Sequence, residues 1–285
     1  MSTIAIIAKP QKPELATILP DVTAWLKSRG FDVVLDRVAG SYVGDKNAVE
    51  RQELPKHNPS LVIVLGGDGT LLATARVFAK TGTPILSANL GSLGFLTEVR
   101  LTDLYQTLEG WCQGCCEIDT RAMLQATLHR AADGTSCYLA LNDVVAAKGA
   151  IARMANFTVS INGSPITSFR ADGVIVSTPT GSTAYNLAAN GPILEPSVDA
   201  LTVTAICPHQ LTLRPIVVRG DAKVGLSIEG IPDQTYLTVD GQEMVQLRIG
   251  DELECVRSEH SVKLVRLGQN TFFDVLRTKL KWGER

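Results

Sequence analysis

A single carboxylate lies inside a glycine-rich turn early in the chain. Residues 61–78 read LVIVLGGDGTLLATARVF, a pattern that predicts a buried strand, a tight turn and an amphipathic helix. The turn consists of Gly66, Gly67, Asp68, Gly69 and Thr70. Glycines let a phosphate approach the backbone, and the N–H groups and dipole of a helix N-terminus favour an anion. The turn is therefore a candidate phosphate-binding loop.

Asp68 is the residue of this turn whose presence calls for a chemical explanation. A carboxylate beside bound phosphate repels it, unless the carboxylate accepts a proton from an attacking hydroxyl or holds a cation. Both are roles in phosphoryl transfer, so Asp68 is a candidate catalytic residue. The structural alternative is an ordinary Asp-Gly strand connection. The turn is neither a Walker A loop nor a G-x-G-x-x-G fingerprint, because Leu72 stands where the third glycine is required.

A second polar stretch, STPTGSTAY, follows the apolar run VIV of residues 174–176. It carries four threonine and serine hydroxyls within six residues, which are Thr178, Thr180, Ser182 and Thr183. Such a loop presents hydroxyls and backbone N–H groups to ribose and phosphate oxygens, and Tyr185 adds a face for stacking a purine. A cap for a helix that begins near Ala184 explains the same residues structurally.

Two further positions carry polar groups at the ends of apolar runs. Asn142-Asp143 follows YLAL, and an amide beside a carboxylate can bridge two vicinal ribose hydroxyls, although turn chemistry explains the pair as well. A two-residue hairpin fully explains Asp240-Gly241, so only Gln242 suggests a function there. The four histidines are scattered, and none pairs at ligand spacing.

The GGDGT turn resembles the element shared by NAD kinases and by diacylglycerol and sphingosine kinases, and more distantly by phosphofructokinases. Three further segments narrow the resemblance to the ATP-NAD kinase family: NLGSLGFLTE (89–98), LNDVV (141–145) and RADGVIVSTPTGSTAYNLAANGPIL (170–194). This resemblance implies that Asp68 is the proton acceptor. It also implies a set of NAD contacts, which are Asp68, Gly69, Asn142, Asp143, Asp172, Thr180, Thr183, Ala184, Tyr185, Asn186, Leu187 and Ala188. Arg153, Arg170 and Gln242 match positions that some members of the family use for ligand contacts.

The chain departs from the family pattern at three of these positions. Arg170 stands where relatives often have Lys, which keeps the charge but changes the donor geometry. Asp143 is shorter than the common Glu, and Ala188 lacks the hydroxyl of the frequent Ser.

The resemblance implies an enzyme that transfers the terminal phosphate of ATP to the 2′-hydroxyl of the adenosine ribose of NAD. ATP and NAD are then substrates, with Mg²⁺ or another divalent metal whose ligands the sequence does not assign. A cytoplasmic homodimer or homotetramer is expected. The alternatives are a lipid kinase of the diacylglycerol or sphingosine type, and a non-catalytic dinucleotide sensor.

The positions of the apolar runs predict the elements that carry these residues. Up to about residue 98, short apolar runs alternate with helical segments, which predicts a Rossmann-like α/β domain. Alternating runs then predict a β-sandwich, in which Asn162-Gly163 and Asp240-Gly241 suit two-residue hairpins. We expect residues 1–115 to form the α/β domain on the phosphate and ATP side, 116–260 the NAD-binding sandwich, and 261–285 a strand and helix that pack back on the first domain.

Composition limits the partners. The 285 residues have a formal net charge of −2, which gives no electrostatic reason to expect nucleic acid or an anionic membrane as a partner. No run reaches the ~18 apolar residues of a membrane span, and the N-terminus lacks a secretory core. Six cysteines in such a chain indicate reduced thiols, with a metal or redox role for Cys112, Cys115 and Cys116 as the alternative.

Overall fold

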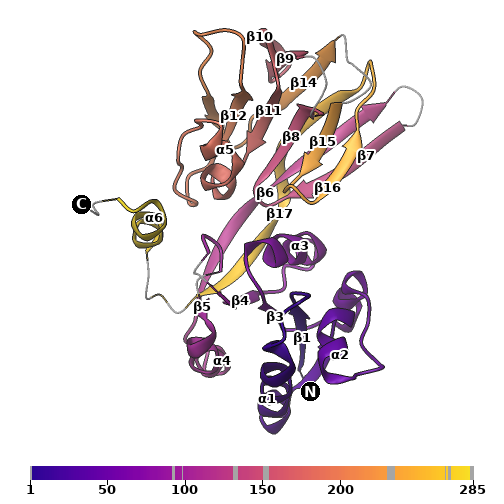
Figure 1. The fold of residues 1–285 in the computed structure, drawn as a ribbon, viewed down its shortest axis with the longest axis vertical. Coiled ribbons are helices and arrows are strands. Elements are labelled where there is room, and N and C mark those ends of the chain that lie inside the picture. The colour runs from indigo at the N-terminus through magenta and orange to yellow at the C-terminus, as the bar shows by residue number, and fades with distance from the viewer. Residues whose placement is uncertain are drawn as a thin grey trace. The chain divides into compact units, whose positions relative to one another are not determined.

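The chain folds into two compact units (Figure 1). The computed structural model describes residues 2–91, 94–97, 99–130, 134–149, 154–229, 235–266, 268 and 271–282. The first unit comprises residues 1–120 and 261–285, and the second comprises residues 121–260. The unit boundaries fall within two long strands, β6 (Glu117–Arg130) and β17 (Glu252–Arg266).

The first unit contains parallel strands in the order β2-β1-β3-β4, with β5 and the end of β17 paired to β4. Its strands are β1 (Thr3–Ala8), β2 (Asp32–Leu35), β3 (Leu61–Leu65), β4 (Ile85–Asn89) and β5 (Val99–Arg100). Its helices are α1 (Leu15–Ser28), α2 (Arg37–Val43), α3 (Asp68–Phe78), α4 (Leu104–Cys112) and α6 (Phe272–Leu280), with 3₁₀ turns at Arg51–His57 and Leu101–Asp103. The predicted α/β fold of this region and its C-terminal helix are confirmed.

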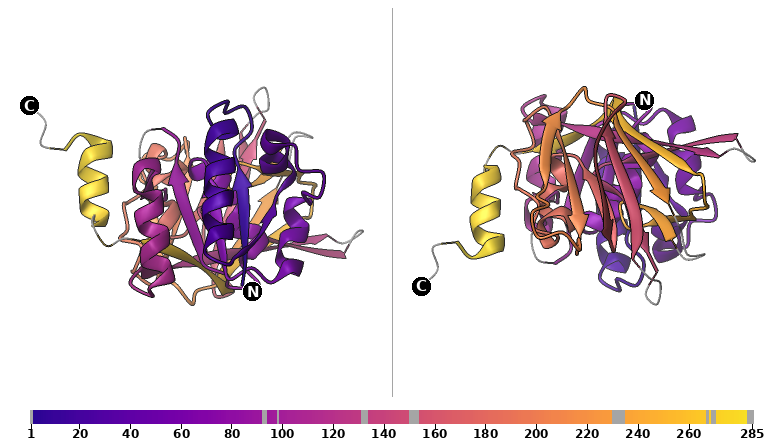
Figure 2. Two further views of the ribbon diagram at one scale, coloured as in Figure 1. Left: turned by 90° about the horizontal axis from the view of Figure 1, so that it is seen from below. Right: turned by 90° about the horizontal axis from the view of Figure 1, so that it is seen from above.

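The central strands β1, β3 and β4 are buried on both faces, as continuous apolar runs require. β3 is buried throughout, and α1 and α4 lie on the same side of the parallel strands (Figure 2). Ile6, Leu19 and Leu108 belong to the core cluster that joins these helices to the sheet. Because β3 and β4 are parallel and Leu65 pairs with Ala88, the turn after β3 lies beside the end of β4.

The second unit is built from two mainly antiparallel sheets, so the predicted β-rich fold is confirmed. One sheet has the order β10-β9-β14-β17-β6-β7 and the other β13-β12-β11-β8-β15-β16. The remaining strands are β7 (Gly134–Ala140), β8 (Asp143–Lys148), β9 (Ala155–Ile161), β10 (Ser164–Ala171), β11 (Gly173–Ser177), β12 (Ala200–Ile206), β13 (Ile216–Arg219), β14 (Val224–Glu229), β15 (Thr235–Val239) and β16 (Glu243–Gln246). Inward side chains of both sheets, among them Val144, Phe157 and Val174, form one core cluster.

The two Asp/Asn-Gly turns differ in length. Ile161 pairs with Ser164, so Asn162-Gly163 is the two-residue hairpin that the sequence predicts, with positive φ at both residues. Val239 pairs with Glu243, so the second connection has three residues and includes Gln242. The two-residue prediction there is wrong because Gln242 N–H bonds to Val239 O and belongs to the turn itself.

Among the described residues, no helix combines the length and the apolar character needed to cross a membrane.

Candidate functional site

The GGDGT turn connects β3 to α3 and places Asp68 at the first position of the helix. Gly66, the first residue of the turn, is buried, and a Cβ there would lie 2.6 Å from Thr70 Oγ1. Gly67 is the N-cap residue in extended conformation, and Thr70 N–H donates to its carbonyl at 2.9 Å. The glycines thus allow an abrupt change from strand to helix, and Asp68 projects from the helix N-terminus.

The Asp68 carboxylate is held by the segment that follows β4. Its Oδ1 accepts hydrogen bonds from Leu96 N at 3.3 Å, Thr97 N at 3.1 Å and Thr97 Oγ1 at 2.9 Å, and its Oδ2 accepts one from Phe95 N at 3.0 Å. A Cβ on Gly94 would overlap Asp68 Oδ1. The backbone therefore closes around the carboxylate, mainly on its Oδ1 side.

Thr97 links Asp68 to the end of the neighbouring strand. Its buried hydroxyl donates to Asp68 and accepts from Asn89 Nδ2 at 2.8 Å, while Asn89 Oδ1 accepts from Gly91 N at 2.9 Å. These residues lie in NLGSLGFLTE, which the sequence marked as part of the family resemblance without assigning any of its residues a role. The sequence pointed to this segment as a whole. The individual contacts could not be predicted from it, because they depend on the register of β3 and β4.

In the second unit, Asn142 and Asp143 lie where β8 begins, next to the end of β15. The carboxylate of Asp240 accepts hydrogen bonds from three consecutive backbone N–H groups, those of Leu141 at 3.0 Å, Asn142 at 2.8 Å and Asp143 at 3.2 Å. Asp240 N–H in turn donates to Asp143 O at 2.9 Å. The sequence treated Asp240 as a turn residue only, and its role as an anchor across about a hundred residues was missed.

The side-chain oxygen of Asn142 and the side chain of Asp143 are both buried at this position. Asn142 Oδ1 is buried and has no hydrogen-bond partner within the described part of the chain. A buried acceptor without a partner is costly unless a ligand or water satisfies it. Asp143 is 4% exposed, and burial, together with the charge of Asp240, raises the pKa of its carboxyl to about 7.

The hydroxyl-rich turn packs directly on Asn142. Thr178 N–H donates to Asn142 O at 2.9 Å, and Thr178 Oγ1 donates to Leu141 O at 2.6 Å and accepts from Gly181 N at 3.1 Å. A Cβ on Gly181 would overlap the Asn142 carbonyl, so only glycine permits this approach. The structure thus brings together three regions predicted to bind NAD: Asn142-Asp143, the turn at 178–184 and the loop at 240–242.

After this turn, some side chains are buried and hydrogen-bonded within the protein, and others are exposed. Asn186 is fully buried, and its amide donates to Ser182 O and Pro192 O and accepts from the hydroxyls of Thr202 and Thr204. Tyr185 is 46% exposed, and Ala188 is also exposed. The short helix α5 (Tyr185–Ala188) begins one residue after Ala184.

The remaining predicted residues lie apart from this group or outside the described residues. Arg170 and Asp172 precede β11, whereas the hydroxyl-rich turn follows it, and five residues of strand separate them by roughly 16 Å. Asp172 pairs with Lys148 Nζ at 3.4 Å, a contact that strand alternation did not reveal. Arg153 lies outside the described residues.

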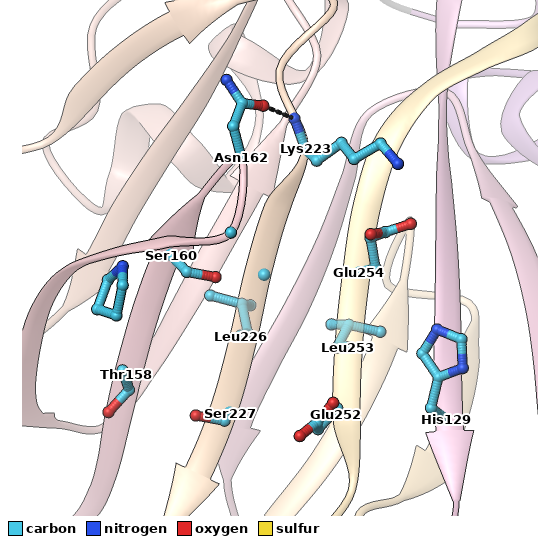
Figure 3. Close-up of a pocket in the computed structure, with 13 residues that line it drawn as sticks. His129, Thr158, Ser160, Asn162, Lys223, Leu226, Ser227, Glu252, Leu253 and Glu254 are labelled. Carbon is cyan, nitrogen blue, oxygen red and sulfur yellow. Dashed lines mark hydrogen bonds between the residues drawn. The ribbon is translucent and has the colours of Figure 1, made fainter.

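A cavity of about 600 Å³ lies elsewhere in the second unit, along β9, β14 and β17 (Figure 3). Lys223, Glu252 and Glu254 line it, and Asn162 Oδ1 accepts from Lys223 N at 2.9 Å. None of the predicted site residues contributes to it.

The cysteines at the end of α4 are free thiols in the structure. Burial, followed by the neighbouring Cys115 and Cys112, raises the pKa of Cys116, and its thiol lies 3.4 Å from Thr107 O. Within the described ranges, no group of three or more His, Cys, Asp or Glu residues is arranged to hold a metal ion.

The packing of Gly181 on Asn142 predicts a loss of stability in Gly181→Ala. The added methyl forces the turn away from β8, and we expect the free energy of unfolding to fall by about 1–3 kcal/mol in urea denaturation. Gly67→Ala is the matched control, because a Cβ there would meet no atom within 4 Å and φ is −111°. Equal stability of the two variants would contradict the close approach.

Burial of Asp143 predicts that Asp143→Asn stabilises the fold more at pH 8 than at pH 5. Because folding raises the pKa of the Asp143 carboxyl to about 7, the native chain loses part of its stability as pH rises from about 4 through about 7. The variant lacks this loss, so its advantage grows between pH 5 and 8 by at most about 3 kcal/mol in urea denaturation. Asp221→Asn, at an exposed turn, is the control. A pH-independent difference between Asp143→Asn and the native chain would refute the assignment.

The chain matches both domain models of one protein family. The model of the ATP-NAD kinase N-terminal domain matches residues 4–115, and that of the C-terminal domain matches residues 141–267. A protein named NAD kinase from Acidobacterium capsulatum is 64% identical over 285 residues, with both chains fully covered. Another from Koribacter versatilis is 49% identical, again over the full length of both.

Two solved structures share the fold. Yeast NADH kinase complexed with NADH superposes with a TM-score of 0.92 at 24% identity, covering 100% of this chain and 89% of that one. An NAD kinase from Archaeoglobus fulgidus in complex with ATP gives a TM-score of 0.77 at 23% identity, with 98% of each chain covered. Matches over both domains and over the full length of the relatives agree: this chain belongs to the ATP-NAD kinase family.

Proposed function

We propose that this enzyme transfers the terminal phosphate of ATP to the 2′-hydroxyl of the adenosine ribose of NAD, with Asp68 as the proton acceptor. The observation that carries the proposal is the Asp68 carboxylate at the start of α3, fixed by the segment 95–97. A fixed carboxylate beside a helix N-terminus suits a reaction that moves a phosphoryl group onto a hydroxyl.

The hydrogen bonds to Asp68 favour Oδ2 as the atom that accepts the proton. Oδ1 accepts three hydrogen bonds from the segment 96–97, whereas Oδ2 accepts one from Phe95 N among the described residues. A carboxylate oxygen has two lone pairs, so Oδ2 keeps the capacity to accept from a substrate hydroxyl. The transferring phosphoryl lies, in this proposal, against the first turn of α3, where Gly66, Gly67, Gly69 and Thr70 let its oxygens approach.

We assign the remaining NAD contacts to the second unit. Asn142 Oδ1 and the Asp143 carboxyl face the ribose hydroxyls, and Tyr185 offers its exposed ring to the adenine. Thr180, Thr183, Ala184, Leu187 and Ala188 contribute hydroxyl, backbone and apolar contacts, and Gln242 adds an amide. Asn186 acts through its backbone and by bracing the turn, because the protein occupies all its side-chain hydrogen-bonding positions. Arg170 and Asp172 form a second contact region at the other end of β11.

Three further properties belong to the proposal. The divalent metal enters with the phosphates of ATP, since Mg²⁺ is commonly held by substrate phosphates together with one or two carboxylates. The six free cysteines fit a reducing, cytoplasmic environment. A homodimer or homotetramer is what the family resemblance suggests.

Neither alternative function is favoured. Membership of the ATP-NAD kinase family argues against a lipid kinase. A dinucleotide sensor would have little use for a carboxylate fixed beside a phosphate-binding turn, and Asp68 and its contacts are intact.

Asp68→Asn tests the proton acceptor. With NAD, ATP and Mg²⁺, we expect kcat for NADP formation to fall about 10²–10⁴-fold, because the amide cannot accept the proton, while the KM for NAD changes little. Asp32→Asn, an exposed position of the same unit, is the control. Wild-type turnover by Asp68→Asn would rule out the assigned role, and NAD binding by the native chain without turnover would favour the sensor.

Thr97→Val tests whether Thr97 positions Asp68. Valine keeps the shape but removes the hydroxyl that joins Asn89 to Asp68, so we expect kcat to fall about tenfold with the KM for ATP nearly unchanged. Thr97→Ser restores the hydroxyl and should recover most of the lost kcat. If serine fails to recover more activity than valine, the hydroxyl has no positioning role.

A further inference from the structure

We propose that Asp240 is a positioning residue for dinucleotide binding. Its carboxylate holds the backbone that carries Asn142 and Asp143, and its negative charge adds to burial in disfavouring the ionised form of Asp143. This inference rests on the proposed NAD contacts of Asn142 and Asp143, and it adds a residue to which the family resemblance assigned no role.

Asp240 does more than form a turn, because its carboxylate holds the backbone of residues 141–143. The three N–H groups of residues 141–143 converge on its two oxygens at 2.8–3.2 Å, and its own N–H continues the ladder to Asp143 O. Asp240 is 8% exposed and has φ of +50°, a conformation that Asn and Asp tolerate better than most residues. A turn that needed only Asp-Gly flexibility would not bury the carboxylate against another strand.

Asp240 is also the charged neighbour that acts on Asp143. Strand β11, which flanks β8 on the other side, brings no titratable side chain in residues 173–177, and the turn 178–184 brings none. Lys148 lies at the far end of β8 and pairs with Asp172, and Arg121 of β6 contacts Thr180 Oγ1 at 3.4 Å. The buried Asp240 carboxylate therefore lies against the Asp143 backbone N–H, and burial together with the charge of Asp240 raises the pKa of the Asp143 carboxyl to about 7.

This arrangement has a consequence for NAD binding. Ionised Asp143 accepts charge-assisted hydrogen bonds from ribose hydroxyls, which are stronger than those of the neutral group. The KM for NAD should therefore fall as pH rises through about 7, where Asp143 ionises. Without the charge of Asp240, the same fall should occur at lower pH.

The test measures the KM for NAD, the KM for ATP and kcat from pH 5.5 to 9 in the native chain, Asp240→Asn and Asp143→Asn. Asparagine tolerates the positive φ of position 240 but offers one acceptor oxygen instead of two. For Asp240→Asn, we expect the midpoint of the KM change to move down by about one pH unit and the KM for NAD at high pH to rise about tenfold. The KM for ATP should stay within about twofold. Asp221→Asn is the control for a charge change at an exposed turn of the same unit.

The outcomes separate the inference from the function on which it rests. If Asp143→Asn weakens NAD use and abolishes the pH dependence, while Asp240→Asn matches the native chain in midpoint and KM, Asp240 has no positioning role and the proposed function stands. If Asp143→Asn leaves the KM for NAD unchanged, the proposed NAD contact itself fails, and the inference fails with it. Should Asp240→Asn not fold, the native chain still decides the electrostatic part, since a KM for NAD that does not vary with pH would overturn it.

Discussion

The candidate residues of each unit depend on one kind of interaction, a carboxylate held by converging backbone N–H groups. Asp68 receives three backbone N–H groups from residues 95–97, and Asp240 receives three from residues 141–143. Hydrogen bonds from N–H to an ionised oxygen are shorter and stronger than neutral ones. In the first unit, the anchored side chain, Asp68, is itself proposed to react. In the second unit, Asp240 holds the segment that carries the proposed NAD contacts Asn142 and Asp143.

These anchors impose a steric requirement on the glycines around them. A Cβ on Gly94 would overlap Asp68, and a Cβ on Gly181 would overlap the Asn142 carbonyl. Glycine is needed at both positions because neighbouring atoms approach the backbone closely, and not because of positive φ, which neither residue has. The β3 and β4 strands and the β8, β11 and β15 strands supply the fixed ends from which these loops project. The folds of the two units thus matter to the chemistry mainly through strand register.

Much of the architecture could be predicted because it depends on local patterns. The buried run LVIVL, followed by glycines and helical spacing, predicted β3, the turn and α3. Alternation predicted the β-rich second part, and Asn162-Gly163 predicted its hairpin. What could not be predicted was long-range: the contact of Asp240 with residue 143 spans 97 positions, and that of Asp68 with Thr97 spans 29. The internal role of Asn186 depends on Thr202 and Thr204 of β12, which no motif joins to it.

A crystal structure of this chain with bound NAD tests the central claim most directly. The account predicts that the 2′-hydroxyl oxygen of the adenosine ribose lies within hydrogen-bonding distance of Asp68 Oδ2, with the N–H bonds from Phe95 and Thr97 to Asp68 retained. It also predicts that Asn142 Oδ1 has acquired a partner from the ligand. A hydroxyl that approaches a different side chain, or an Asp68 carboxylate turned away from the dinucleotide, would contradict the account.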